Sequence, residues 1–329
     1  MGEKIGVIGA GGWGITLTRL LRKMGYRIIL WEPIKKNLDV LKEKRESPDY
    51  FPGFKVPEGV DITGSIREVT LGSDVIIIVV RSTFFRNTIK QLKKFYTGQP
   101  LLIGTKGLER DTGNVMSEII ISELGNNIPF GVLSGPTIAR EIAEGMPSAA
   151  VVATKRKNIG LLFQKILSCE TLRIYTNTDI KGAEIGGAFK NVIAIGAGII
   201  DGLGLGINTK AAYLTRGLNE MSRIGCRLGG REKTFRGLSG MGDLITTSFS
   251  KFSRNRSFGE AIVKIGKERY LKENKMVIEG LFATEAFYRL SRKMGLELPI
   301  TQSIYRIIYE NTQPEIEIKK LMTRKPKEE

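Results

Sequence analysis

Residues 4–14 read KIGVIGAGGWG and contain Gly9, Gly11 and Gly14 in the spacing G-x-G-x-x-G. The segment begins as a short β-rich run and continues into WGITLTRLLRKMG, whose apolar residues recur at helical spacing. A glycine loop that follows a strand and opens a helix is the arrangement that binds a dinucleotide. In it Gly9 permits a tight turn, Gly11 the approach of the pyrophosphate, and Gly14 close packing of helix on strand. The alternative interpretation is a merely flexible turn.

Outward from this loop, short β-rich segments alternate with helical patterns through the first half of the chain. The further expected strands are RIILW, DVIIIVV, PLLIG, FGVLSG, SAAVVAT and TLRIYT. The segment DVIIIVV is apolar throughout, which is typical of a parallel strand covered on both faces. Strand–helix alternation predicts a Rossmann-type doubly wound parallel sheet in an α/β fold.

The pattern changes near Thr178, after which glycine-broken helical segments replace the strands. Because 329 residues exceed what one core usually holds, we expect two domains. The sequence predicts a dinucleotide-binding domain at 1–180 and an all-α, substrate-binding domain at 181–329.

The composition indicates a globular protein of a reducing compartment. Hydrophobic residues make up 41% of the chain, and no uninterrupted apolar run reaches the ~18 residues of a membrane span. The expected first strand begins too early for a signal peptide to precede it. The two cysteines, Cys169 and Cys226, lack the spacing of a metal or redox site. We therefore expect a cytoplasmic protein without membrane insertion and without a metal.

The formal charge of +17 favours an anionic partner, either a nucleic acid, an acidic lipid or a phosphorylated metabolite. A lysine-rich soluble surface explains the same number. No basic run is interleaved with aromatic residues as a surface for stacking bases requires. We therefore expect a small phosphorylated ligand and no nucleic acid, while a basic nucleic-acid-binding protein is retained as an alternative.

Glu32 ends the second expected strand, where an acid normally accepts the ribose hydroxyls of NAD. A carboxylate there repels the 2′-phosphate of NADP, although Lys35 and Lys36 follow within a turn and oppose this repulsion. The residue predicts a preference for NAD(H) over NADP(H). A solvated strand end is the alternative explanation for Glu32.

Polar residues follow several expected strands, and ligands bind at the carboxyl ends of strands in open sheets. They are Lys106, the run Ser134–Thr137, and Arg81 with Ser82. The chain contains no histidine, so proton transfer falls to Lys, Asp, Glu, Tyr or Cys.

Lys190 and Asn191 lie in an apolar, glycine-rich helical run, GGAFKNVIAIGAGII. Such a lysine either extends its amine to the surface, or pairs with a buried acid such as Glu184 or Asp243, or lines a cleft and performs chemistry. Asp243 lies in an expected glycine-flanked turn, where a helix cap is the alternative. Arg254, with its neighbours in SRNRS, is interpreted as a phosphate-binding fork or as a solvated basic loop.

Together these motifs resemble the NAD(P)-dependent glycerol-3-phosphate dehydrogenase family of bacterial type. The segments that carry the resemblance, in family order over nearly the whole chain, are GAGGWG, GTKGLE, SGPTIAREIAEGMPSA, GGAFKNVIAIGAGIIDGLGLGINTKAA, TFRGLSGMGDLITT, SRNR and MVIEGLFATEA. The resemblance implies reversible hydride transfer between NAD(P)H and dihydroxyacetone phosphate, which gives sn-glycerol 3-phosphate for phospholipid synthesis. It also implies a homodimer.

The resemblance assigns residue roles by position. Lys190 matches the general acid–base, with Lys106, Asp243 and Asn191 as further catalytic residues. The substrate contacts that it implies are Lys106, Gly135, Thr137, Lys190, Asp243, Ser253, Arg254 and Asn255. The coenzyme contacts that it implies, beside the three loop glycines and Glu32, are Gly12, Trp13, Lys106, Ala139, Arg254, Val277 and Glu279.

The chain departs from the family pattern at two places. Glu32 and Pro33 stand where many bacterial members have a basic residue that suits NADPH, and VRS, with Arg81, replaces the frequent VPS. A 3-hydroxy acid dehydrogenase of the same architecture is the nearer alternative, although a substrate without phosphate needs less of the cationic SRNR segment.

Overall fold

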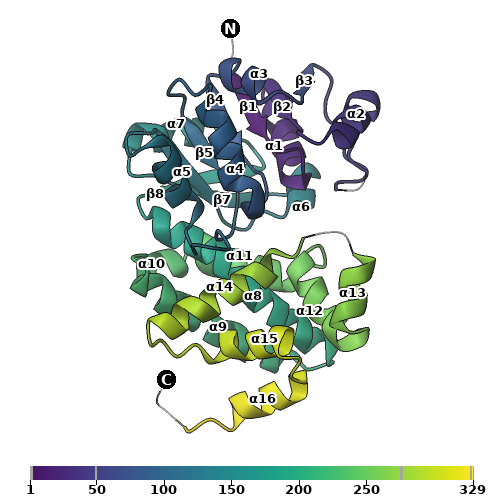
Figure 1. Cartoon of the computed structure of the whole chain (residues 1–329), viewed down its shortest axis with the longest axis vertical. Coiled ribbons are helices and arrows are strands. Elements are labelled where there is room, and N and C mark those ends of the chain that lie inside the picture. Colours follow the sequence, from purple (N-terminus) through teal and green to yellow (C-terminus); the bar gives the residue numbers. More distant parts are fainter. Residues whose placement is uncertain (1–2, 49, 275–276, 327, 329) are drawn as a thin grey trace.

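The computed structural model describes residues 3–48, 50–274, 277–326 and 328. Figure 1 shows a sheet covered by helices in the N-terminal half and a helical C-terminal half stacked end to end with it. Each half has its own apolar core: two clusters cover the two faces of the sheet, and a third is formed largely by the C-terminal helices.

One eight-stranded sheet organises the N-terminal half, in the order β3-β2-β1-β4-β5-β6-β7-β8. The strands are β1 Lys4–Ile8, β2 Arg27–Trp31, β3 Val60–Thr63, β4 Val75–Ile78, β5 Leu101–Ile103, β6 Phe130–Ser134, β7 Ser148–Ala153 and β8 Leu172–Asn177. Strand β4 is fully buried, as its continuous apolar sequence predicted.

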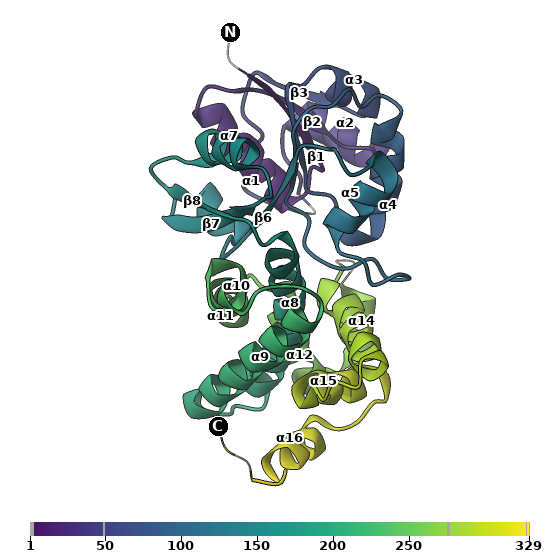
Figure 2. The same ribbon diagram turned by 90° about the vertical axis from the view of Figure 1, so that its left-hand side faces the viewer.

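Helices cover both faces of the sheet, as the doubly wound prediction requires. They are α1 Gly12–Lys23, α2 Lys35–Lys44, α3 Ile66–Leu71, α4 Ser82–Lys93, α5 Met116–Leu124, α6 Ala139–Ala143 and α7 Lys157–Leu167. Helices α1 and α7 pack on one face, and α3, α4 and α5 pack on the other. The two groups lie on opposite sides of the sheet in Figure 2.

The strand order reverses between β1 and β4, which is where open α/β sheets bind their ligands. The glycine loop lies at this point. Gly9 adopts a φ of +120°, and a Cβ on it would lie 3.0 Å from the backbone of Val79. A Cβ on Gly14 would lie 1.8 Å from the Gly9 oxygen. The predicted roles of both glycines in turn and packing are therefore visible in the backbone.

Two details of the sheet differ from the sequence prediction. Strand β3 was not predicted, because its four residues, VDIT, form a short edge strand that contains an exposed aspartate. Strand β7 runs antiparallel to β6, so the sheet is mostly rather than wholly parallel. The connection between them contains only the short helix α6. The Ala139 oxygen of α6 accepts a hydrogen bond from Thr16 of α1. After α6 the chain enters β7 at the carboxyl end of β6 and runs back along it in the opposite direction.

Helices build the C-terminal half. They are α8 Ile180–Gly202, α9 Ile207–Arg227, α10 Glu232–Phe235, the π-helical turn η1 Leu238–Gly242, α11 Asp243–Phe249, α12 Arg254–Lys264, α13 Lys267–Glu273, α14 Glu279–Lys293, α15 Pro299–Tyr309 and α16 Pro314–Met322. Helix α8 runs through their centre, and its apolar window is long enough to cross a membrane but is entirely buried in the protein. It is the core helix of this half.

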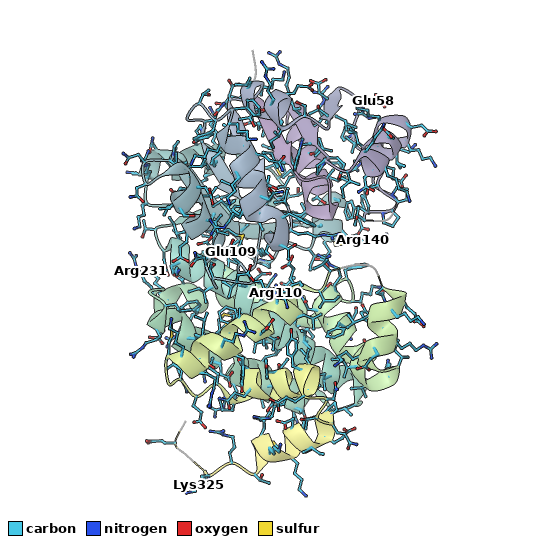
Figure 3. All side chains as sticks on the ribbon, in the orientation of Figure 1. Glu58, Glu109, Arg110, Arg140, Arg231 and Lys325 are labelled. Atoms are coloured by element: carbon cyan, nitrogen blue, oxygen red, sulfur yellow. The ribbon has the colours of Figure 1, made fainter. Side chains whose placement is uncertain are left out.

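Side chains connect the two halves at several places along the junction. Glu184 accepts hydrogen bonds from the backbone N–H (2.7 Å) and the hydroxyl of Ser117, at the first turn of α5. Arg110 lies 3.7 Å from Glu285 of α14, and Arg140 lies over the ring of Phe252 at 5.3 Å. Figure 3 shows Arg110 and Arg140 at the level where the halves meet. The junction is therefore a packed, polar interface on both sides of the sheet's carboxyl edge.

Candidate active site

The glycine loop fits the pyrophosphate of a dinucleotide. A Cβ on Gly11 would meet no described atom within 4 Å, so this backbone borders open space, and Gly11 is the residue before the first turn of α1. The first residues of α1, Gly12 and Trp13, direct their backbone N–H groups toward the same end of the helix. N–H groups that lack intrahelical partners, together with the helix dipole, attract phosphate.

Glu32 is buried at the end of β2, so the alternative of a solvated strand end is wrong. One carboxylate oxygen accepts a hydrogen bond from the backbone N–H of Ile34 at 3.0 Å. Burial raises the pKa of Glu32, while hydrogen bonds from Ile34 and Asn37 and the charge of Arg81 lower it. Lys35 and Lys36 are exposed in the first turn of α2.

Trp13 and Ala139 lie on either side of the loop. A Cβ on Gly104 would lie 3.2 Å from the Trp13 indole nitrogen, which places the segment that carries Lys106 beside the first turn of α1. Ala139 is held next to α1 by the hydrogen bond from Thr16. The structure therefore gathers both predicted coenzyme contacts around the glycine loop.

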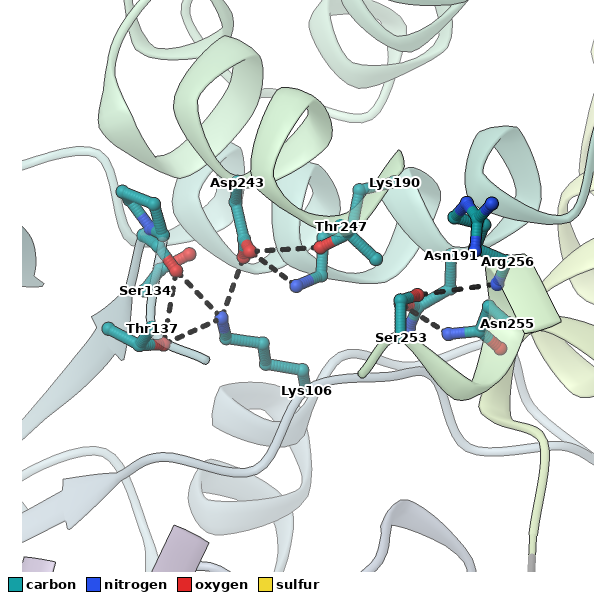
Figure 4. Close-up of polar contacts among 12 residues, drawn as sticks. Lys106, Ser134, Thr137, Lys190, Asn191, Asp243, Thr247, Ser253, Asn255 and Arg256 are labelled. Carbon is teal, nitrogen blue, oxygen red and sulfur yellow. Dashed lines mark hydrogen bonds and ion pairs between the residues drawn. The ribbon is translucent and has the colours of Figure 1, made fainter. Parts of the chain in front are cut away.

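Lys106 leaves the sheet after β5 and reaches across the junction. Its ammonium donates to the Gly135 carbonyl (3.0 Å), to the Thr137 hydroxyl (3.3 Å) and to Asp243 Oδ2 (2.6 Å). Gly135 has a φ of +131°, a conformation that favours glycine. Figure 4 shows these contacts converging on the one ammonium group.

Asp243 joins the two lysines of the site. Its other oxygen, Oδ1, accepts a hydrogen bond from Lys190 Nζ, and the carboxylate is almost fully buried. The expected glycine-flanked turn is wrong, because the π-helical turn η1 runs directly into α11 and Asp243 is the first residue of that helix. The residue is also not the helix cap, a position that Gly242 occupies. The side chain is thereby free to point at the lysines.

Lys190 is buried in the middle of α8. Of the partners considered, Asp243 binds it and Glu184 binds Ser117 instead. Burial lowers the pKa of Lys190 to about 7; Asp243 opposes this shift, and the nearby charge of Lys106 adds to it. A lysine with a pKa near neutrality exchanges protons readily at physiological pH.

Thr247 also belongs to this centre, although sequence reasoning missed it. Its hydroxyl lies 3.4 Å from Asp243 Oδ1, one helical turn farther along α11. Residues four apart share one face of a helix, so prediction of a helix over this segment would have identified Thr247 as a neighbour of the aspartate.

The SRNRS segment forms the first turn of α12, so the interpretation as a loop is wrong. Ser253 is the N-cap of this helix, and its hydroxyl accepts a hydrogen bond from the backbone N–H of Arg256. Arg256 pairs with Asp201 at 2.6 Å and is thereby committed to structure. Arg254 remains exposed and donates to the Val277 carbonyl at 3.3 Å.

Asn191 and Asn255 form a buried amide pair beside Lys190. Asn255 donates to Asn191 Oδ1 at 2.9 Å and accepts from the backbone N–H of Gly280, also at 2.9 Å. These bonds fix the N-terminal ends of α12 and α14 side by side. The structure thus links two residues predicted for the site, Asn191 of α8 and Asn255 of α12, by a direct hydrogen bond.

Glu279 connects α14 of the helical half to α4 of the half that contains the glycine loop. It begins α14 and accepts a hydrogen bond from the Ser82 hydroxyl at 2.6 Å, across the junction. Burial raises the pKa of Glu279, and the hydrogen bond from Ser82 and the charge of Arg254 lower it. The predicted coenzyme contacts on the helical half therefore lie opposite the carboxyl edge of the sheet.

A glycine loop at a sheet's switch point, facing a lysine–aspartate–lysine centre across a junction, defines a nicotinamide-dependent dehydrogenase. The sequence pattern of the NAD-dependent glycerol-3-phosphate dehydrogenase N-terminus matches residues 4–160, and that of the C-terminus matches residues 179–319. The chain belongs to the NAD-dependent glycerol-3-phosphate dehydrogenase family.

Relatives and solved structures agree with this assignment along the whole chain. The glycerol-3-phosphate dehydrogenase [NAD(P)+] of Geobacter metallireducens is 42% identical, over 100% of this chain and 99% of its own. That of Halothermothrix orenii is 40% identical, over 100% and 97%. The crystal structure of the Coxiella burnetii enzyme superposes with a TM-score of 0.94 at 33% identity, covering 98% of this chain and 99% of its own.

Proposed function

We propose that the protein catalyses reversible reduction of dihydroxyacetone phosphate to sn-glycerol 3-phosphate with NAD(P)H, and so supplies the backbone of glycerophospholipids. The observation that carries this proposal is the buried Asp243 that joins Lys106 and Lys190 opposite the glycine loop. Family membership supports the substrate, since the relatives are named for it.

Lys190 is the proposed general acid–base. When bound, the coenzyme supplies a hydride to the C2 carbon of the ketone. Lys190 donates the proton that the C2 oxygen then needs, and takes it back in the reverse reaction. Among the described residues Asp243 is the one hydrogen-bond partner of the Lys190 ammonium, which leaves protons for the substrate. Its lowered pKa suits a group that must release a proton near neutrality.

Asp243 and Lys106 position this lysine. The carboxylate holds both ammonium groups, so it fixes the direction of Lys190 and separates the two charges. Lys106 contributes a cation near the ketone oxygen, which stabilises negative charge that develops there. Gly135 and Thr137 in turn fix Lys106. Thr247 adds a further hydroxyl to the same carboxylate.

Arg254, Asn255 and Ser253 are the proposed phosphate site, with Asn191 behind them. Arg254 is the exposed guanidinium at the start of α12, and helix N-terminal N–H groups favour phosphate. This cationic group argues against the alternative of a 3-hydroxy acid dehydrogenase, because a substrate without phosphate leaves it unused. The nucleic-acid-binding alternative finds no support in the family relationship.

We propose NAD(H) as the preferred coenzyme. The buried Glu32 stands where it meets the ribose hydroxyls and repels a 2′-phosphate. Gly9, Gly11, Gly12, Trp13 and Gly14 form the proposed pyrophosphate site. Ala139, Val277 and Glu279 are the proposed contacts toward the nicotinamide end, with Lys106 and Arg254.

We also propose that the protein is a cytoplasmic homodimer and that each subunit consists of two domains, 1–180 and 181–329. The division is supported by the separate cores of the two halves and by the change from strand β8 to helix α8 between Asn177 and Ile180. Within the described residues, no cluster of three or more His, Cys, Asp or Glu is placed to hold a metal ion.

The test is a two-by-two assay with NADH or NADPH, and with dihydroxyacetone phosphate or unphosphorylated dihydroxyacetone. We expect turnover of the phosphorylated ketone and a kcat/KM at least tenfold higher with NADH, about 1.4 kcal/mol. Equal use of the two ketones contradicts the phosphate site, and equal or better use of NADPH contradicts the role of Glu32. Oxidation of a 3-hydroxy acid in preference to glycerol 3-phosphate contradicts the proposed substrate.

A further inference from the structure

Arg81 occupies the switch point of the sheet, beside the glycine loop. It follows β4 and is the N-cap residue of α4. The two residues before it pack directly on the loop, since a Cβ on Gly9 would lie 3.0 Å from the Val79 backbone and 3.1 Å from the nitrogen of Val80. Arg81 thus leaves the sheet in the crevice between β1 and β4.

The guanidinium of Arg81 has no ion-pair or hydrogen-bond partner among the residues that the structure describes. It lies over the ring of Tyr50, 5.4 Å from the centroid. Phe51, the next residue, faces the start of α1, because a Cβ on Gly12 would lie 3.0 Å from its ring. The loop that contains Tyr50 therefore brings the half-buried guanidinium and the pyrophosphate end of α1 together.

Arg86 shows what a structural arginine looks like on the same helix. It donates to Glu109 at 2.5 and 2.7 Å, to Glu123 at 2.6 Å and to Ser122 at 3.1 Å. The guanidinium of Arg81, five residues earlier, lies over the Tyr50 ring and makes no such bond to any described residue.

Charges around Arg81 place it midway along the coenzyme site. Burial raises the pKa of Glu32 and of Glu279, and the charge of Arg81 lowers both. Glu32 stands at the proposed adenosine-ribose end, and Glu279 at the opposite end on the helical half. Between these ends a dinucleotide carries its two pyrophosphate charges, beside the N-terminus of α1.

We propose that Arg81 binds the pyrophosphate of the coenzyme and, with Tyr50, covers it from the side opposite the glycine loop. A guanidinium offers two parallel N–H groups to phosphate oxygens. The inference rests on the proposed function only in so far as a nicotinamide dinucleotide is the coenzyme. Since NADH and NADPH share the pyrophosphate, Arg81 strengthens the binding of both and does not select between them.

The test is equilibrium binding to the full-length protein, measured by calorimetry with NADH, NADPH, ADP and adenosine. Arg81→Gln is expected to raise the Kd about tenfold for NADH, NADPH and ADP alike, about 1.4 kcal/mol, and to leave adenosine unaffected. The matched control is Arg27→Gln, which removes the same charge from an exposed residue. Arg27 begins β2, at the end of the strand away from Glu32 and the coenzyme site.

A second variant keeps the test independent of local folding. The φ of Arg81 is −62°, which proline adopts without strain, so Arg81→Pro removes the guanidinium while preserving the backbone. It should weaken the three phosphate-bearing ligands as Arg81→Gln does. Unchanged binding in both variants overturns the proposal, and so does a loss confined to NADPH, which assigns Arg81 to the 2′-phosphate. A wild-type protein that binds neither coenzyme refutes the proposed function itself.

Discussion

Two glycine-rich segments of this protein have similar composition but differ in what surrounds their glycines. In the loop at residues 9–14, Gly11 borders open space, where a Cβ would meet nothing within 4 Å. In helix α8, a Cβ on Gly198 would lie 1.9 Å from the Arg256 carbonyl oxygen of α12, and one on Gly186 would lie 2.4 Å from the Ser239 oxygen. The first segment makes room for a ligand, and the second makes room for neighbouring backbone.

This difference explains how a lysine becomes buried in α8. The glycines cost helix propensity, about 1 kcal/mol each relative to alanine. In return, other helices approach α8 closely and enclose Lys190 and its partner Asp243. The loop needs open space to bind a ligand. Helix α8 needs close packing, because burial is what lowers the pKa of Lys190.

The largest expected effect tests the chemistry that this closeness creates. Lys190→Met keeps most of the side-chain bulk and removes the proposed proton donor, so kcat should fall by roughly 10²–10⁴ while NADH binding persists. Lys190→Arg should fail nearly as badly, since guanidinium does not release a proton near neutrality. Steady-state turnover at saturating substrate is the measurement. An Arg variant within a few-fold of wild type would falsify the acid–base role.

The next effect tests the packing role of the helix glycines. Gly198→Ala places a methyl group against the backbone of α12, which two helices at this distance cannot accommodate without moving apart. We expect a loss of about 2–3 kcal/mol in the free energy of unfolding, measured by urea denaturation. A change within about 0.5 kcal/mol contradicts the contrast between the segments.

Gly11→Ala is the counterpart in the loop. Its φ of −76° and ψ of 179° suit alanine, so the free energy of unfolding should change by less than about 0.5 kcal/mol. The methyl group instead occupies the space proposed for the pyrophosphate, and the Kd of NADH should rise about tenfold. Calorimetric titration of both glycine variants decides the matter. Unimpaired binding in Gly11→Ala shows that the open space beside this residue is not the pyrophosphate site.

The smallest expected effect concerns pH. Reduction requires protonated Lys190, so its rate should fall as pH rises through about 7, whereas oxidation of glycerol 3-phosphate should accelerate over the same range. Because the charge of Lys106 lowers this pKa, Lys106→Gln should move the apparent pKa in its residual activity upward. Profiles of kcat between pH 5.5 and 9 test both statements. A flat profile in the wild type contradicts the titration of Lys190.

Much of this fold follows from local sequence. Short β-rich runs predicted seven strands, and the run in β4 is apolar throughout, as a strand buried on both faces requires. The edge strand β3 was not predicted, because it has only four residues and its exposed Asp61 is typical of a loop. The antiparallel direction of β7 was not predicted either, because a strand's own residues do not encode the direction in which its neighbour runs.

The sequence indicated which residues lie in the candidate site, but not which side chains bind one another there. Lys106, Lys190 and Asp243 were all expected there, yet nothing local says that one carboxylate binds both lysines across 137 and 53 residues of chain. Two arginines in SRNRS look equivalent in the sequence, and only the position of Asp201 separates the structural Arg256 from the exposed Arg254. Pairings of this kind depend on tertiary distance, which periodicity does not contain.

The ion pair between Lys106 and Asp243 has a consequence for synthesis on the ribosome. The sheet, with its coenzyme loop and Lys106, is complete in the chain by Asn177, before either Lys190 or Asp243 has been made. A nascent or truncated N-terminal half therefore lacks the proposed proton donor Lys190 and the carboxylate that holds it. If the proposed roles hold, turnover requires helices α8 and α11 to pack against the carboxyl edge of the finished sheet, so activity reports that the two halves have assembled.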